Sequence, residues 1–162
     1  MILGLSVATF TLVHVIISLV GIGSGIVVFL AMLARDRVAA WTALFLISTI
    51  LTSVSGFFFH STAIGPPHVF GVISLVVLAA AVLARYVFAL AGWWRLIFIV
   101  GAWIALYLNC VVAVIQFFQK FSFLQPLAPT QTEPPFLITQ AVMLAIFVIV
   151  GIAAGIRFRP AA

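Results

Sequence analysis

Three histidines, His14, His60 and His68, are the residues of this sequence best suited to chemistry. Neutral imidazole is a common protein ligand for zinc, copper and haem iron, and it exchanges protons near neutral pH. With Glu133 nearby, the three imidazoles could form a metal site, and His14 with His68 could hold a haem. A proton-handling or quinone-type site is a second interpretation. A structural role is the third, because no pair has the HxxxH or HxxH spacing of preorganised ligands.

Four further polar side chains, Thr52, Asn109, Gln116 and Gln140, interrupt long apolar stretches. A polar group in apolar surroundings needs a hydrogen-bond partner, which either a ligand or a neighbouring helix can supply. We therefore predict one ligand-binding set, comprising His14, Thr52, His60, His68, Asn109, Gln116 and Gln140, with the three histidines as candidate metal ligands. No catalytic residue is predicted, because no Ser/His/Asp, Cys/His or zincin constellation occurs.

Long apolar runs make up most of the chain and must position these residues. Of 162 residues, 67% are hydrophobic and 6% charged, and the mean hydropathy is +1.46. The runs span about 3–34, 38–59, 67–92, 95–118 and 135–156, each longer than the roughly 20 residues that cross a bilayer as a helix. Lipid cannot satisfy an open strand edge, so each run should be helical. The prediction is an all-α, five-transmembrane-helix bundle forming one domain over residues 1–162.

The positive charges predict the orientation of this bundle. One side of the predicted membrane carries Arg35, Arg37, Arg85, Arg95, Arg157 and Arg159, and the other carries only Lys120. Cytoplasmic loops retain Lys and Arg, so we expect the N-terminus outside and the C-terminus in the cytoplasm of a multi-pass cell-membrane protein, the inner membrane if the source is bacterial. The net charge of +5 then indicates contact with anionic lipid and not with nucleic acid. The first run follows no basic region and should be retained as a helix.

Depth and helical spacing group the polar residues. The seven predicted site residues lie about 21 to 35 Å from the nearest arginine at 1.5 Å per residue, in the outer half of the bilayer. Small and polar residues also share one face on each of four predicted helices. The faces are Thr11, His14, Ser18, Gly21 and Gly25; Ser48, Thr49, Thr52, Ser55 and Gly56; Ala102, Ala105, Asn109, Ala113 and Gln116; and Gln140, Leu144, Phe147, Gly151 and Gly155. We expect these faces to point at one another, which interhelical packing alone would also explain.

The remaining reactive residue types limit the choice of function. Asp36 and Glu133 are the only acids, and both lie outside the apolar runs, which disfavours an ion-driven secondary transporter. Cys110 is the only cysteine, so it forms no intrachain disulfide, and we expect it to act as a small buried hydrophobe. Pro-Pro pairs at 66–67 and 134–135 should begin helices.

Together these patterns predict a small integral membrane binding or accessory protein with a polar, histidine-containing ligand pocket in the outer half of the bilayer. The alternatives are a membrane redox enzyme or quinone-reactive subunit, and a structural or assembly partner of a larger membrane complex. Membrane lipid is the expected partner, with the chain a homo-oligomer or the subunit of a complex. Haem or metal remains an open cofactor interpretation.

Overall fold

The computed structural model describes residues 1–59 and 65–159, and its long elements are all helices. They are α1 (Val7–Leu33), α2 (Ala39–Gly56), α3 (Pro66–Val82), α4 (Trp94–Lys120) and α5 (Pro134–Arg157). The π-helical turn η1 (Leu83–Val87) continues α3, and the short 3-10 turn η2 (Gln125–Leu127) lies between α4 and α5. Five spans are long and apolar enough to cross a membrane. The predicted all-α architecture with five such helices is confirmed and indicates a multi-pass membrane protein.

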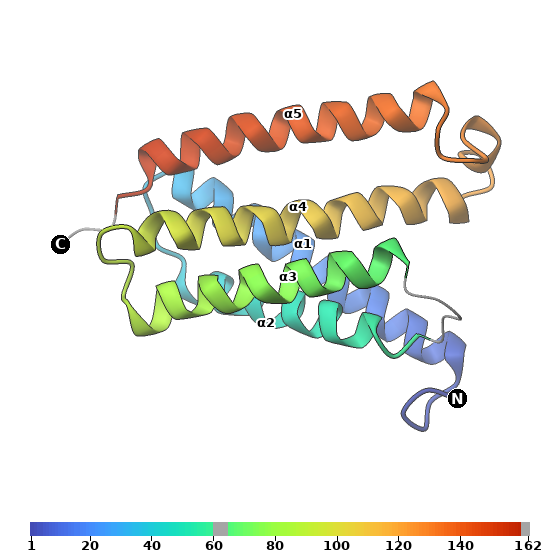
Figure 1. Cartoon of the computed structure of the whole chain (residues 1–162), viewed down its shortest axis with the longest axis horizontal. Coiled ribbons are helices and arrows are strands. Elements are labelled where there is room, and N and C mark those ends of the chain that lie inside the picture. The colour runs from blue at the N-terminus through green and yellow to red at the C-terminus, as the bar shows by residue number, and fades with distance from the viewer. Residues whose placement is uncertain (60–64, 160–162) are drawn as a thin grey trace.

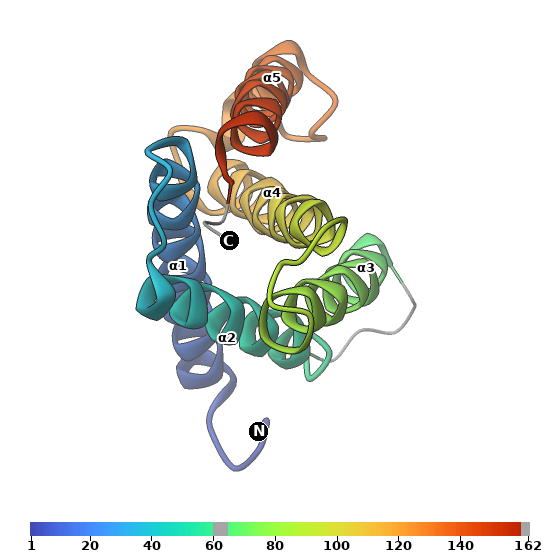
Figure 2. The same ribbon diagram turned by 90° about the vertical axis from the view of Figure 1, so that its left-hand side faces the viewer.

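The helices pack mainly in chain order. Contacts join α1 to α2, α2 to α3, α3 to α4 and α4 to α5, and α1 also touches α4 and α5. Figure 1 shows α1 crossing the bundle obliquely behind α4, whereas α3, α4 and α5 run nearly side by side. The end-on view in Figure 2 places α4 between α3 and α5 and leaves α5 at the outside of the bundle. Helix α4 therefore contacts each of the other four long helices.

Local sequence explains where the helices begin. Residues Ile2 and Leu5 close a tight turn through two backbone hydrogen bonds of 3.0 Å, with Gly4 at φ +81°. Ser6 then caps α1, its Oγ accepting from Thr9 N at 3.1 Å. The first helix therefore starts at Val7, later than the apolar run that predicts it, because the first apolar residues of the run form this turn. The proline pairs begin α3 and α5 as predicted, since the first helical turn does not use the missing N–H.

The densest part of the core lies toward the end that carries the arginines. Its largest fully buried side chains include Phe45 and Leu46 of α2, Phe98 and Ile99 of α4, and Leu78 of α3. Glycines allow close helix contact here. A Cβ at Gly25 would lie 2.7 Å from Leu106 Cδ1 and 2.9 Å from the Phe45 ring, and a Cβ at Gly101 would lie 2.7 Å from the Val77 carbonyl oxygen.

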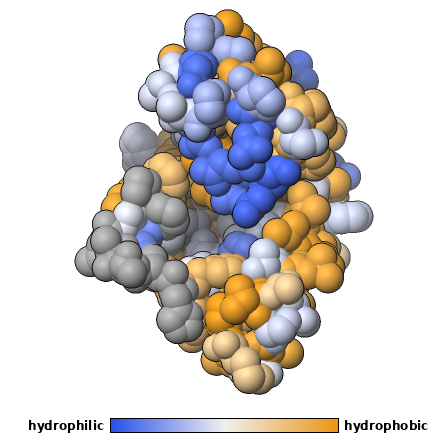
Figure 3. All heavy atoms as spheres, turned by 90° about the vertical axis from the view of Figure 1, so that its right-hand side faces the viewer, coloured by the Kyte–Doolittle hydropathy of each residue, from blue (hydrophilic) through white to orange (hydrophobic). Residues whose placement is uncertain are grey.

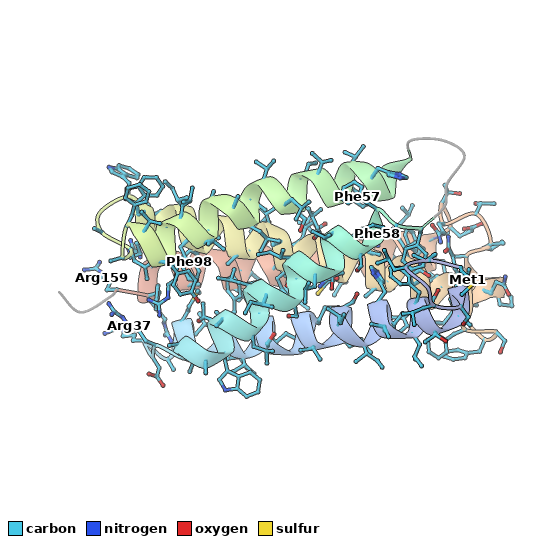
Figure 4. All side chains as sticks on the ribbon, turned by 90° about the horizontal axis from the view of Figure 1, so that it is seen from below. Met1, Arg37, Phe57, Phe58, Phe98 and Arg159 are labelled. Carbon is cyan, nitrogen blue, oxygen red and sulfur yellow. The ribbon has the colours of Figure 1, made fainter. Side chains whose placement is uncertain are left out.

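The two ends of the bundle differ in charge. We call the end bearing Arg35, Arg37, Arg85, Arg95, Arg157 and Arg159 the arginine end, and the opposite one the N-terminal end. Figure 4 shows Arg37 and Arg159 at one end and Met1, Phe57 and Phe58 at the other. Arg95 Nη1 donates to the carbonyls of Gly155 at 2.9 Å and Phe158 at 2.6 Å, and Arg157 donates to Leu33 O at 3.4 Å. These guanidinium groups satisfy carbonyls that helix C-termini leave unpaired.

Candidate functional site

An open groove of about 460 Å³ lies at the N-terminal end of the bundle. It is lined by Met1, Ile2, Leu3, Phe57, Phe58, Phe59 and His68. The side chains of Phe57 and Phe58 are 39% and 43% exposed, respectively. Among the described residues, the side chains of the groove are therefore aromatic and aliphatic except for the imidazole of His68. We call it the aromatic groove.

Three segments build the aromatic groove. The chain leaves α2 at Gly56 and turns through 57–59, while the Ile2–Leu5 turn brings the N-terminus alongside. His68 lies in the first turn of α3, where its Nδ1 accepts from Gly65 N at 3.3 Å. Gly71 lets the Phe57 ring lie against α3, because a Cβ there would be 2.8 Å from Phe57 Cζ. The Phe57 and His68 rings are 6.0 Å apart.

His14 stands behind this groove, half-buried between α1 and α2. Its Nδ1 lies 2.8 Å from Ser55 Oγ, and its ring meets the Phe59 ring edge-on at 5.2 Å. Ser55 uses its single hydroxyl hydrogen to donate to Thr52 O at 3.1 Å, so His14 Nδ1 is the donor to Ser55. The neutral imidazole then carries its lone pair on Nε2, the nitrogen that could accept a proton or ligate a metal.

Asn109 and the hydroxyls of α2 meet α1 deeper in the bundle. A Cβ at Gly21 would lie 3.1 Å from Thr49 Oγ1 and 3.3 Å from both Ser48 Oγ and Asn109 Nδ2. Asn109 Nδ2 donates to Ser18 O at 3.5 Å. Thr52 is partly buried on the same side of α2 as Thr49 and Ser55. The structure thus brings together the predicted faces of α1, α2 and α4.

The two glutamines of the predicted site lie apart from this contact between α1, α2 and Asn109. Gln140 of α5 donates from Nε2 to Val111 O of α4 at 3.5 Å, and Gln116 is exposed on α4. The predicted face of α5 meets a different side of α4 from Asn109. Trp103 Nε1 donates to Phe147 O at 2.6 Å, and a Cβ at Gly151 would lie 2.5 Å from that indole nitrogen. Gln116 and Gln140 therefore do not join the contacts that Asn109 makes with α1, and His60 lies outside the described residues.

The structure describes two of the three predicted metal ligands, His14 and His68. His60 lies outside the described residues, and within 1–59 and 65–159 no group of three or more His, Cys, Asp or Glu side chains is placed to hold a metal ion. His14 contacts Phe59, whereas His68 contacts Phe57. A metal or haem held with His60 stays a prediction. Cys110 is half-buried and packs against the core.

The loop between α4 and α5 forms the polar part of the N-terminal end. Figure 3 shows hydrophilic side chains gathered in the upper middle of this face, with apolar ones mainly to the right of them and below. Glu133 accepts from Thr130 Oγ1 at 2.8 Å and from the backbone N–H groups of Thr130 and Thr132 at 3.1 Å each. Slight desolvation opposes ionisation, but these hydrogen bonds outweigh it and hold the pKa of Glu133 below its ordinary value. The carboxylate thus organises the loop.

Two structural features were not predicted from the sequence. The N-terminal turn was assigned to the first helix, so its contribution to the groove was missed. The Trp103 contact was also missed, although a tryptophan within an apolar span indicates that its indole N–H needs a partner. The sequence feature that could have indicated the groove is the run of three phenylalanines at 57–59.

No protein-family model matches the chain, and neither a curated protein nor a solved structure shows significant similarity to it.

Proposed function

We propose that this chain is a membrane-embedded binding protein that takes an amphipathic small molecule into the aromatic groove. The observation that carries the proposal is the composition of that groove: three consecutive phenylalanines, an apolar N-terminal turn and the imidazole of His68. Its volume of about 460 Å³ falls within the usual range for small-molecule sites, which combine apolar walls with a few polar groups. Such a lining suits an apolar chain with a hydrogen-bonding head.

The position of the groove favours a ligand that arrives from the bilayer. On α3, which carries His68 of the groove lining, the apolar side chains of Val69 and Val72 are 49% and 53% exposed. The groove lies at the end of the apolar spans, at the level where lipid chains meet headgroups. A molecule with an acyl chain and a polar head would reach the groove without leaving the membrane.

The orientation of the protein is part of the same proposal. All six arginines lie at the arginine end, and Lys120 lies at the opposite one, beside the α4–α5 loop. Positive charge is retained on the cytoplasmic side, so the aromatic groove would face the outside of the cell. Cysteines introduced singly at Gln125 and at Arg159, in a Cys110→Ser background, test this with a membrane-impermeant maleimide. Labelling of Arg159→Cys and not of Gln125→Cys in intact cells would contradict it.

A photoreactive palmitate carrying a diazirine tests binding in the groove. The protein is reconstituted in phosphatidylcholine bilayers, and the crosslinked peptides are mapped by mass spectrometry. We expect labelling of 57–59 that saturates and is displaced by unlabelled palmitate, while labelling of lipid-facing Ile149 stays proportional to the probe. Labelling that follows exposure everywhere and is not displaced would overturn the proposal.

Variants sharpen the same experiment. His68→Leu removes the polar side chain of the groove and should weaken saturable labelling about three- to tenfold, the effect of losing one hydrogen bond. Val69→Ala is the matched control, because it lies next in sequence and outside the groove lining. Equal loss in both variants would mean that His68 does not hold the head of the ligand.

A further inference from the structure

Hydroxyl side chains inside the long helices mostly find a partner on their own backbone. Serines and threonines of α1, α2 and α5 donate to the carbonyl four residues earlier, at 2.6 to 3.0 Å: Thr11, Ser18, Ser24, Thr42, Ser48 and Thr139. Thr49 and Thr52 of α2 differ. Their Oγ1 atoms are buried and make no hydrogen bond to any described residue.

Burying these two hydroxyls without a hydrogen-bond partner costs free energy. Thr49 is 1% exposed, so neither lipid headgroups nor bulk water reach its side chain from the surface of the bundle. A buried hydroxyl without a partner costs about 1 to 3 kcal/mol, and hydrocarbon offers no hydrogen bond. A polar molecule between the helices would remove that cost at both threonines.

Because Gly21 has no side chain, polar atoms of two other helices pack closely against α1 at this position. We call this cluster of polar atoms the polar cradle. Thr49 Oγ1, Ser48 Oγ and Asn109 Nδ2 all lie within 3.3 Å of the point where a Cβ of residue 21 would be. The three atoms come from α2 and α4 and surround the missing side chain on α1. Asn109 itself makes only a long contact, 3.5 Å to Ser18 O. Groups with unused hydrogen-bonding capacity thus converge from both neighbouring helices on one place.

A row of polar residues leads from the polar cradle toward the N-terminal end, and apolar side chains lie on its arginine side. Thr49, Thr52 and Ser55 follow one another at three-residue steps along α2, and Ser55 accepts from half-buried His14. From His14 to Gly21 the polar row extends about 10 Å along α1. One turn further, Gly25 lies directly against Phe45 and Leu106, so apolar side chains end the row.

We propose that water enters the bundle beside His14 and binds along α2 as far as Asn109, hydrating Thr52 and Thr49 and stopping at Phe45 and Leu106. Buried water usually makes two to four hydrogen bonds, and the hydroxyls and carboxamide here supply that number. The protein is then hydrated through half of its membrane span. This water site goes beyond the aromatic groove and shares no side chain with its lining.

Water-edited solid-state NMR on the full chain in lipid bilayers tests the proposal without any substitution. Magnetisation from water should reach the methyl groups of Thr49 and Thr52 at least about fivefold faster than the methyl group of Ala105, because bound water lies in contact with the threonines. Ala105 is the matched control, since it is 0% exposed and lies one turn from Asn109 on α4. Transfer to both threonines as slow as to Ala105 would overturn the proposal.

Cysteine accessibility gives an independent measurement. In a Cys110→Ser background, Thr52→Cys should react with a small water-soluble methanethiosulfonate at least about tenfold faster than Ile47→Cys, because only a hydrated thiol ionises. Ile47 is 58% exposed on the same helix and faces lipid. Faster reaction at Ile47→Cys would contradict a hydrated row. Ligand binding in the aromatic groove can fail without changing either result, so the two proposals are separable.

Discussion

The arginine half and the N-terminal half of the bundle are built on different principles. In the first, large apolar side chains such as Phe45, Leu46 and Phe98 are fully buried and arginines satisfy helix ends. In the second, polar groups lie between the helices and the Phe57–Phe59 run lines an open groove. Dense apolar packing provides stability but leaves no space for a ligand. Stability therefore comes mainly from the arginine half, whereas the N-terminal half carries the groove in which we propose that a ligand binds.

The largest expected effect comes from removing a core ring of the arginine half. Phe45→Ala leaves a cavity against Gly25 and should lower the free energy of unfolding by about 3 to 5 kcal/mol. Phe58→Ala, at a site 43% exposed, should cost less than about 1 kcal/mol because it opens no cavity. Denaturation of both variants in mixed micelles measures the difference. Equal losses would remove the distinction between the two halves.

A glycine pair tests the packing of the helices on α4. Gly101→Ala places a Cβ 2.7 Å from the Val77 carbonyl, a backbone atom that cannot turn aside, and should cost about 1 to 3 kcal/mol. Gly155→Ala meets no atom within 4 Å and should be neutral or slightly stabilising, because alanine favours the helix. The thermal midpoints of the two purified variants give the comparison. A destabilised Gly155→Ala would show that this open surface is occupied in the bilayer.

Arginine capping predicts a smaller loss. Arg95→Gln removes the charged donor to Gly155 O and Phe158 O and should destabilise the protein by about 1 to 2 kcal/mol, chiefly by freeing the end of α5. Hydrogen exchange of residues 150–157 would locate the effect. Lys120→Gln, exposed at the opposite end, is the control and should leave exchange in α5 unchanged.

The smallest effect is expected at the α4–α5 loop. The hydrogen bonds from Thr130 and Thr132 depress the pKa of Glu133, so its contribution is present above the unfolded-state pKa of about 4.3 and is lost as pH falls through the lower folded-state pKa. Glu133→Gln should therefore loosen the loop at pH 7 and match the wild type at strongly acidic pH. Limited proteolysis between 125 and 133 as a function of pH measures this. A difference that persists in acid would mean that charge is not the cause.

Much of the fold could be predicted because each helix has its own local signal. Apolar length indicated five helices, and Pro66 and Pro134 marked two helix starts. The start of α1 was placed too early, since hydropathy does not distinguish a turn of apolar residues from the helix that follows. The faces of α1, α2 and α4 were identified from three- and four-residue spacing, which reports which residues share a side of a helix.

The candidate site could be predicted only in part. Spacing indicated that the polar faces of α1, α2 and α4 would meet, as the atoms around Gly21 do, but it gave no information on which side of α4 would receive α5. Gln140 therefore lies against Val111, apart from Asn109. The groove was missed because it joins the N-terminus to the end of α2, and no periodicity within one helix describes such a contact.

By itself the sequence determined the number of helices, their approximate limits, the polar faces and the concentration of arginine at one end, because helix formation in lipid and loop charge depend on local composition. The tertiary structure decided which faces meet, that α1 crosses the bundle obliquely, that α5 packs through Trp103, and that Phe57–Phe59 and His68 border one groove. These contacts depend on how side chains of different helices fit together, which is a property of pairs of surfaces and is not encoded in any single segment.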